Sequence, residues 1–135
     1  MFARVLVVDD DQFVLLALMA MRKRLGCHIE AASSSRQALE KLRTNRPFDV
    51  VVSDRDMPGM DGLEFLRRCR EHTPDMVRLM LSGSTEDAFI EAAVREGLLF
   101  RFIPKPCLPH QLAIHVEAGL EERRQRTQLA LDDEK

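Results

Sequence analysis

Polar side chains that could carry chemistry stand at or directly after the ends of four apolar runs. They are three consecutive carboxylates, a fourth carboxylate, a hydroxyl and an ammonium group: Asp9, Asp10, Asp11, Asp54, Ser82 and Lys105. Carboxylates forced together repel one another and take up protons unless a cation neutralises them. An all-oxygen cluster without His or Cys suits a hard ion such as Mg²⁺ or Mn²⁺. Such a cluster with a hydroxyl and a lysine is typical of phosphoryl transfer, in which an aspartate can itself be the nucleophile.

The elements that must position these side chains alternate along the chain. The β-rich runs cover residues 4–8, 27–31, 49–53, 77–82 and 100–103, and the helical patterns begin near residues 11, 34, 61, 84–85 and 109. This alternation predicts an α/β fold, with a parallel sheet between two layers of helices. In such sheets ligands bind at the carboxyl ends of the strands, so we expect the polar residues to meet there.

Composition limits the classes of function. The 135 residues predict one domain, and a net charge of −2 makes nucleic-acid binding by this domain unexpected. The longest apolar run covers nine residues, 13–21, and is too short to span a membrane. Three widely spaced cysteines without a CxxC pair disfavour zinc or disulfides and favour a cytoplasmic location. The four histidines show no carboxylate or cysteine constellation and are expected at the surface.

Four stretches together resemble the receiver domains of response regulators in bacterial two-component signalling, including the single-domain chemotaxis type. They are VLVVDDD (5–11), DVVVSDRDMPGMDG (49–62), MLSGS (80–84) and FRFIPKP (100–106). The resemblance covers residues 3 to about 119. It implies a flavodoxin-like, doubly wound, five-stranded parallel sheet with strand order 2-1-3-4-5 and five helices. We therefore expect a receiver domain over residues 1–119 and a charged helical extension, or a linker to an output domain, over residues 120–135.

The resemblance implies a phosphoacceptor and a metal site in this sequence. Asp54 would accept the phosphoryl group. Asp10 would be the direct carboxylate ligand of Mg²⁺ or Mn²⁺, Asp9 would hold a metal-bound water, and the main-chain carbonyl of Asp56 would be a further ligand. An aspartate after a strand is more often only a helix N-cap, and we assign Asp11 to that class, together with Asp61.

The resemblance also implies groups that contact the phosphoryl oxygens. Ser82 stands where receivers carry a Thr or Ser that hydrogen-bonds this group, and Lys105 matches a lysine that pairs with it, followed by a cis bond to Pro106. Phe102 matches the switch aromatic, whose rotamer follows Ser82. Simple core packing is an equally good interpretation of Phe102.

The implied partners are a histidine kinase or a histidine phosphotransfer protein, and an output domain or partner protein. The protein would not be a turnover enzyme, although it would promote its own phosphorylation and dephosphorylation. One alternative is a pseudo-receiver that only binds a partner. Another is a haloacid-dehalogenase-type phosphatase, which Asp54-x-Asp56 resembles, but its acidic pair follows the lysine, whereas here Asp9-Asp10 comes first.

An apolar patch is expected on the outer side of the first helix, over residues 11–25. Five apolar residues suffice to cover the sheet: Val14, Ala17, Leu18, Met21 and Leu25. By the helical period Leu15, Leu16 and Met19 fall on the other side. Leu129 and Leu131 of the extension would fold back over them, or a second copy would cover them. A homodimer through the first or the C-terminal helix is therefore a further expectation.

Overall fold

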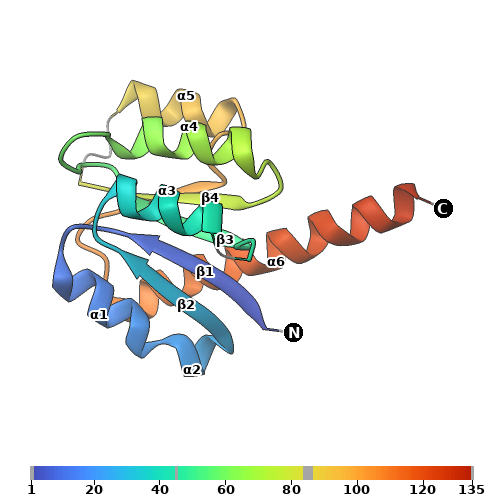
Figure 1. Ribbon diagram of the computed structural model, residues 1–135, viewed down its shortest axis with the longest axis horizontal. Coiled ribbons are helices and arrows are strands. Elements are labelled where there is room, and N and C mark those ends of the chain that lie inside the picture. Colours follow the sequence, from blue (N-terminus) through green and yellow to red (C-terminus); the bar gives the residue numbers. More distant parts are fainter. Residues whose placement is uncertain (1, 45, 84–86, 135) are drawn as a thin grey trace.

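The computed structural model describes residues 2–44, 46–83 and 87–134 and shows a parallel sheet between two layers of helices (Figure 1). The elements, in chain order, are β1 Ala3–Val8, α1 Gln12–Ala20, α2 Arg22–Leu25, β2 Cys27–Ala32, α3 Ser35–Thr44, β3 Val50–Asp54, α4 Gly62–His72, β4 Val77–Ser82, α5 Ala88–Arg95, β5 Arg101–Pro104 and α6 Pro109–Asp133. In these ranges no helix has the combined length and apolar character needed to span a membrane.

The five strands are all parallel and lie in the order β2-β1-β3-β4-β5, which confirms the expected flavodoxin-like topology. Val8 pairs with Ser53, Asp54 with Leu81, and Ser82 with Pro104. Because these registers align the ends of β1, β3, β4 and β5, the residues that follow them gather at one edge of the sheet.

Two separate cores hold the helices on the sheet. Val5 and Val7 of β1 face the core beneath α1, α2 and α6, whereas Leu6 and Val8 face the core beneath α3, α4 and α5. Each fully buried aliphatic side chain of this size contributes about 1.5–3 kcal/mol relative to exposure. Every residue of β3 is buried, so the strand that carries Asp54 lies at the centre of a well-packed frame.

Aspartates cap three of the helices. Asp11 accepts a hydrogen bond from Phe13 N at 2.9 Å and Asp61 accepts one from Glu64 N at 2.9 Å, so both predicted N-caps are confirmed. Asp87 caps α5 through Phe89 N at 2.8 Å. The predicted start of this helix near residues 84–85 falls outside the described residues.

The first helix differs from its prediction. The pattern predicts one helix over residues 11–25, but α1 ends at Ala20 and α2 is a single turn, because Met21 N bonds back to Leu18 O at 3.0 Å and tightens the chain. The apolar patch is wrong for two of its three members. Leu15 is only 7% exposed, and Met19 packs against the core, while Leu16 remains 65% exposed. Residues 12–21 are apolar nearly all round, so their sequence does not specify which side faces the sheet.

The C-terminal extension continues α6 without a break and leads away from the sheet (Figure 1). Val116, Gly119 and Leu120 anchor the helix on the sheet, whereas Leu129 and Leu131 are 63% and 52% exposed. The expected fold-back of these two leucines over α1 is therefore wrong. Charged groups of the extension would lose hydration on folding back, whereas the continuous helix keeps them in solvent. Leu129 and Leu131 therefore have no intramolecular cover among the described residues.

Candidate functional site

Asp54, Asp9 and Lys105 meet at the carboxyl edge of the sheet. Asp54 ends β3, Asp9 follows β1, and Lys105 follows β5. Lys105 Nζ lies 2.8 Å from Asp54 Oδ1 and 3.9 Å from Asp9 Oδ2. Asp9 is fully buried and Asp54 is 3% exposed, so the ion pairs lie in a partly dehydrated environment where they are stronger than in water.

The backbone holds Lys105 in place. Its main-chain N–H donates to Ser82 O at 2.8 Å, and its peptide bond to Pro106 is cis, as the resemblance implied. Ser82 ends β4 and is 1% exposed. The structure thus brings the predicted lysine and hydroxyl residues to the same edge as the carboxylates.

Three carboxylates form an oxygen cluster. One carboxylate oxygen each of Asp9, Asp10 and Asp54 lies within 4.8 Å of the others, and Asp10 is the exposed member. Asp9 Oδ1 accepts from Asp11 N at 2.9 Å, but the buried Asp9 Oδ2 accepts no hydrogen bond within the described part of the chain. A buried carboxylate oxygen without a donor is costly, and a cation would satisfy it. The cluster therefore fits a hard divalent ion such as Mg²⁺ or Mn²⁺.

The pKa values of two groups reflect this crowding. Burial raises the pKa of Asp9 from 3.8 to about 6; the Asp11 amide opposes this shift, and the charge of Asp54 adds to it. Burial by itself would lower the pKa of Lys105, but its hydrogen bond to Asp54 and the charge of Asp9 outweigh burial and raise it. Lys105 is therefore charged at neutral pH, and a bound cation would favour the ionised form of Asp9.

The loop after β3 packs tightly on the site. The main-chain N–H of Asp56 points to Asp54 Oδ1 at 3.4 Å, and the Asp56 side chain is exposed. A Cβ at Gly62 would come within 2.3 Å of Asp54 O, so only glycine fits there without a shift of the backbone. Gly62 is not among the site residues predicted from the sequence, although its position directly after the capping Asp61 is a usable signal.

An ion pair links the site to α5. Arg55, the residue after Asp54, pairs through Nη1 with Asp87 Oδ2, and Asp87 is also the N-cap of α5. The sequence gives no local signal for this pair because its members lie 32 positions apart.

Phe102 lies on β5, where Phe102 pairs with Met80 and the neighbouring Pro104 pairs with Ser82. Its half-buried ring packs against the core beneath α3, α4 and α5. This position agrees with the core-packing interpretation of Phe102, and the role of Phe102 as a switch remains a prediction.

Comparison with known proteins gives the class of this domain. Residues 5–117 match the response regulator receiver domain family, so the chain belongs to that family. It is 35% identical over 120 residues to the hydrogenase transcriptional regulatory protein HoxA of Cupriavidus necator, covering 88% of this chain and 24% of that protein. It is 36% identical over 122 residues to the sensor kinase CckA of Brucella abortus, covering 90% of this chain and 13% of that protein. The chain thus spans a quarter or less of these two relatives.

Solved structures agree with this assignment. A structure described as adenylate cyclase from Rhodopirellula baltica superposes with a TM-score of 0.87 at 31% identity and covers 100% of this chain and 99% of that one. A response regulator receiver domain from Clostridium thermocellum gives a TM-score of 0.81 at 28% identity, with 91% and 98% covered. Family membership favours the receiver interpretation over the phosphatase alternative. Receivers are generally phosphoacceptors in two-component signalling that bind Mg²⁺ at an aspartate cluster.

Proposed function

We propose that this protein accepts a phosphoryl group on Asp54 from a histidine kinase or a histidine phosphotransfer protein. The observation that carries the proposal is the position of Asp54. It is buried at the end of the central strand, 2.8 Å from Lys105 and beside Asp9, whose Oδ2 accepts no hydrogen bond within the described residues. A nucleophile needs a fixed direction of attack, and the packed frame of β3 supplies it.

The proposed step balances when the second ring nitrogen of the donor's phosphohistidine carries a proton, so that the leaving group is neutral imidazole. A carboxylate oxygen of Asp54 forms a bond to phosphorus as the phosphorus–nitrogen bond of the donor's phosphohistidine breaks, and the imidazole leaves with the bonding electrons. Since Asp54 Oδ1 already accepts from Lys105, we assign the attack to Oδ2. The Lys105 ammonium then binds a phosphoryl oxygen, as does the Ser82 hydroxyl, and both stabilise charge on the equatorial oxygens.

The cluster would hold Mg²⁺ or Mn²⁺ through the carboxylates of Asp10 and Asp54 and the main-chain carbonyl of Asp56, with Asp9 contributing through a bound water. The ion, when bound, neutralises charge on the carboxylates and the phosphoryl oxygens. The protein's own contribution is to fix the ligands: Asp9 is oriented by the Asp11 amide, and Asp54 by Lys105.

We assign the output to a change of surface around Ser82 and Phe102 that acts on an output domain or a partner protein. The protein is then a phosphoacceptor that promotes its own phosphorylation and dephosphorylation, not a turnover enzyme. All three cysteines are free, which supports a cytoplasmic setting. Of the two surfaces proposed for a homodimer, the α6 extension is the better candidate, because two members of the α1 patch are packed inward.

The test is phosphorylation with acetyl phosphate and Mg²⁺, followed by peptide mapping by mass spectrometry. We expect one phosphate on Asp54, loss of it in Asp54→Asn, and retention in Asp75→Asn, a matched change at an exposed aspartate before β4. Phosphate on Asp54→Asn at unchanged yield would refute the assignment. No modification of the folded wild type would instead favour the pseudo-receiver, and turnover of p-nitrophenyl phosphate would favour the phosphatase.

A further inference from the structure

The sheet has an open edge at β2. This strand pairs with β1 on one side, and in the described part of the chain no strand pairs with its other side. Asp9 N donates to Ala32 O at 3.1 Å, so the main-chain groups of Ala32 point toward β1. Since the direction of the main-chain groups alternates along a parallel strand, Ile29 and Ala31 direct their N–H and C=O groups outward. Such a row of groups is a template for another strand.

A shallow groove of about 720 Å³ runs along this edge. Among the described residues that line it are four permanent cations, namely Arg4, Arg22, Lys41 and Arg46, against the one carboxylate of Glu30. The local charge is therefore +3, before any protonation of His28, on a chain whose net charge is −2. This local excess opposes pairing with a second copy of the same edge and favours an acidic partner.

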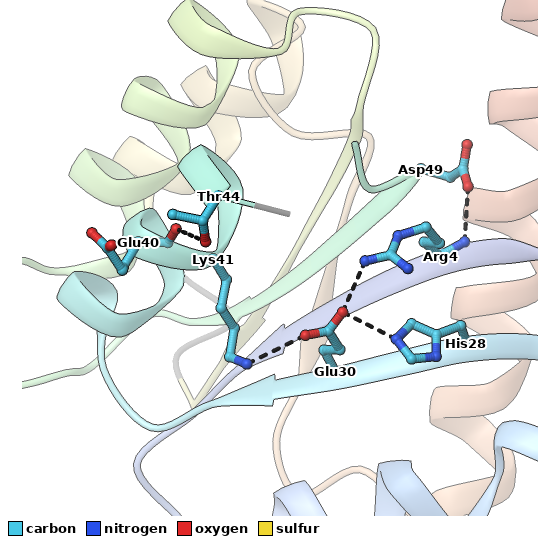
Figure 2. A network of polar contacts seen from close by, with 7 residues as sticks. All are labelled: Arg4, His28, Glu30, Glu40, Lys41, Thr44 and Asp49. Carbon is cyan, nitrogen blue, oxygen red and sulfur yellow. Dashed lines mark hydrogen bonds and ion pairs between the residues drawn. The ribbon is translucent and has the colours of Figure 1, made fainter. Parts of the chain in front are cut away.

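Glu30 contacts three of the basic side chains, but its single negative charge does not balance the positive charge of the groove. Its Oε2 lies 2.8 Å from Arg4 Nη2 and 3.0 Å from His28 Nε2, and its Oε1 lies 3.3 Å from Lys41 Nζ (Figure 2). Burial acts to raise the pKa of Glu30, but the hydrogen bonds from His28 and Lys41 lower it overall. Arg22 and Arg46 are exposed and form no ion pair within the described ranges, so they are available to a ligand.

The cations lie on both sides of the edge. Lys41 belongs to α3 and Arg46 follows it, on the face where Glu30 points, whereas Arg22 belongs to α2 on the opposite face, beside Met19. The side chains of an added strand alternate between the same two faces. An extended segment would thus place every second residue near Lys41 and Arg46, and the intervening residues near Met19 and Arg22.

We infer that this edge binds an extended acidic segment of a partner protein, which adds to β2 as a further strand. Main-chain hydrogen bonds to Ile29 and Ala31 provide the pairing, and carboxylates facing Lys41 and Arg46 provide the selectivity. This binding is independent of Asp54 and uses a different edge of the molecule from the proposed phosphorylation site.

The test uses an acetylated, amidated hexapeptide of alternating Glu and Val as the probe, titrated into the ¹⁵N-labelled protein. We expect the largest amide shifts at Ile29 and Ala31, slower hydrogen exchange there, and weaker binding as salt increases. The same peptide with alternate amides N-methylated keeps its charge but cannot pair as a strand. It should bind at least about tenfold more weakly, a loss of about 1.4 kcal/mol.

Matched charge reversals separate this site from general attraction. The double variant R22E/R46E removes two unpaired, exposed cations from the groove and should weaken binding about tenfold or more. R70E/R95E makes the same change of charge on α4 and α5 and should leave binding unchanged. Equal binding of the methylated peptide, equal loss in both double variants, or shifts that avoid β2 would each overturn the inference. Equally tight binding of a short DNA duplex would show a general polyanion surface instead.

Discussion

Arg78 offers the sharpest test of how this fold is held together. It is the second residue of β4 and is only 4% exposed. Its guanidinium donates to Leu98 O at 2.7 Å and to Met76 O at 2.9 Å, with longer contacts to Pro74 O at 3.3 Å and Gly97 O at 3.4 Å. One side chain thus joins the loop before β4 to the loop before β5. Burial lowers the pKa of Arg78, and no carboxylate pairs with it among the described residues.

The change Arg78→Met keeps the apolar stem and removes the donors. The variant loses the two short hydrogen bonds, and each loss leaves a buried carbonyl without this donor at a cost of about 1–3 kcal/mol. Removing the buried positive charge also removes its desolvation penalty, which offsets part of this cost. We therefore expect a net loss of about 2–4 kcal/mol in the free energy of unfolding. This is a large fraction of the 5–15 kcal/mol that is typical of a domain.

The assay is urea unfolding followed by far-UV circular dichroism, since the chain has no Trp or Tyr to serve as a fluorescent probe. Arg78→Lys retains the charge without the fork of donors and should fall between wild type and Arg78→Met. Arg95→Met, at an exposed position on α5, is the control and should change stability by less than about 0.5 kcal/mol. A similarly small change in Arg78→Met would refute the structural role of this guanidinium.

Three further predictions concern the site itself. The pKa of Asp9 is about 6 in the folded protein and 3.8 ordinarily, so the metal-free protein should lose about 3 kcal/mol of its free energy of unfolding as pH rises from about 4 to 7. The variant Asp9→Asn should not show this loss when unfolding is measured in EDTA. Parallel pH profiles of the wild type and the variant would contradict the prediction. Gly62→Ala should destabilise the protein by about 1–3 kcal/mol because the added Cβ would meet the Asp54 carbonyl. In the control Gly119→Ala the added Cβ would meet only side chains, the nearest at 3.4 Å, so this change should be neutral or stabilising. Equal Tm values for the two variants would contradict the prediction. Asp10→Asn should lose Mg²⁺ affinity in calorimetric titrations yet stay folded, because Asp10 is exposed, and an unchanged titration would place the ligand elsewhere.

The carboxyl edge of the sheet could be predicted because its signals are local. The apolar runs that form β1 and β3 end directly at Asp9 and Asp54, so the strand pattern alone places both carboxylates at the same edge. The roles of Ser82, Phe102 and the Asp56 carbonyl came from resemblance, since nothing in an isolated hydroxyl or ring specifies them.

Other features depend on contacts between distant parts of the chain. The rotation of α1 is set by the fit of Leu15 and Leu18 to the sheet, and an almost uniformly apolar helix does not reveal it. The carbonyl partners of Arg78 come from two loops, which no local pattern connects. The surroundings of His28 were misjudged although the signal was present: Glu30 is two positions away on a strand and therefore on the same face.

The straight course of α6 has a mechanical consequence. The helix is fixed to the sheet as far as Leu120 and then continues to Asp133, about 13 residues, or about 20 Å at 1.5 Å per residue. A rod of that length amplifies motion at its support: a tilt of about 10° at the sheet would carry the far end through about 3 Å. A small repacking beneath Val116 and Leu120 would thereby become a displacement of several ångströms at the far end of the helix.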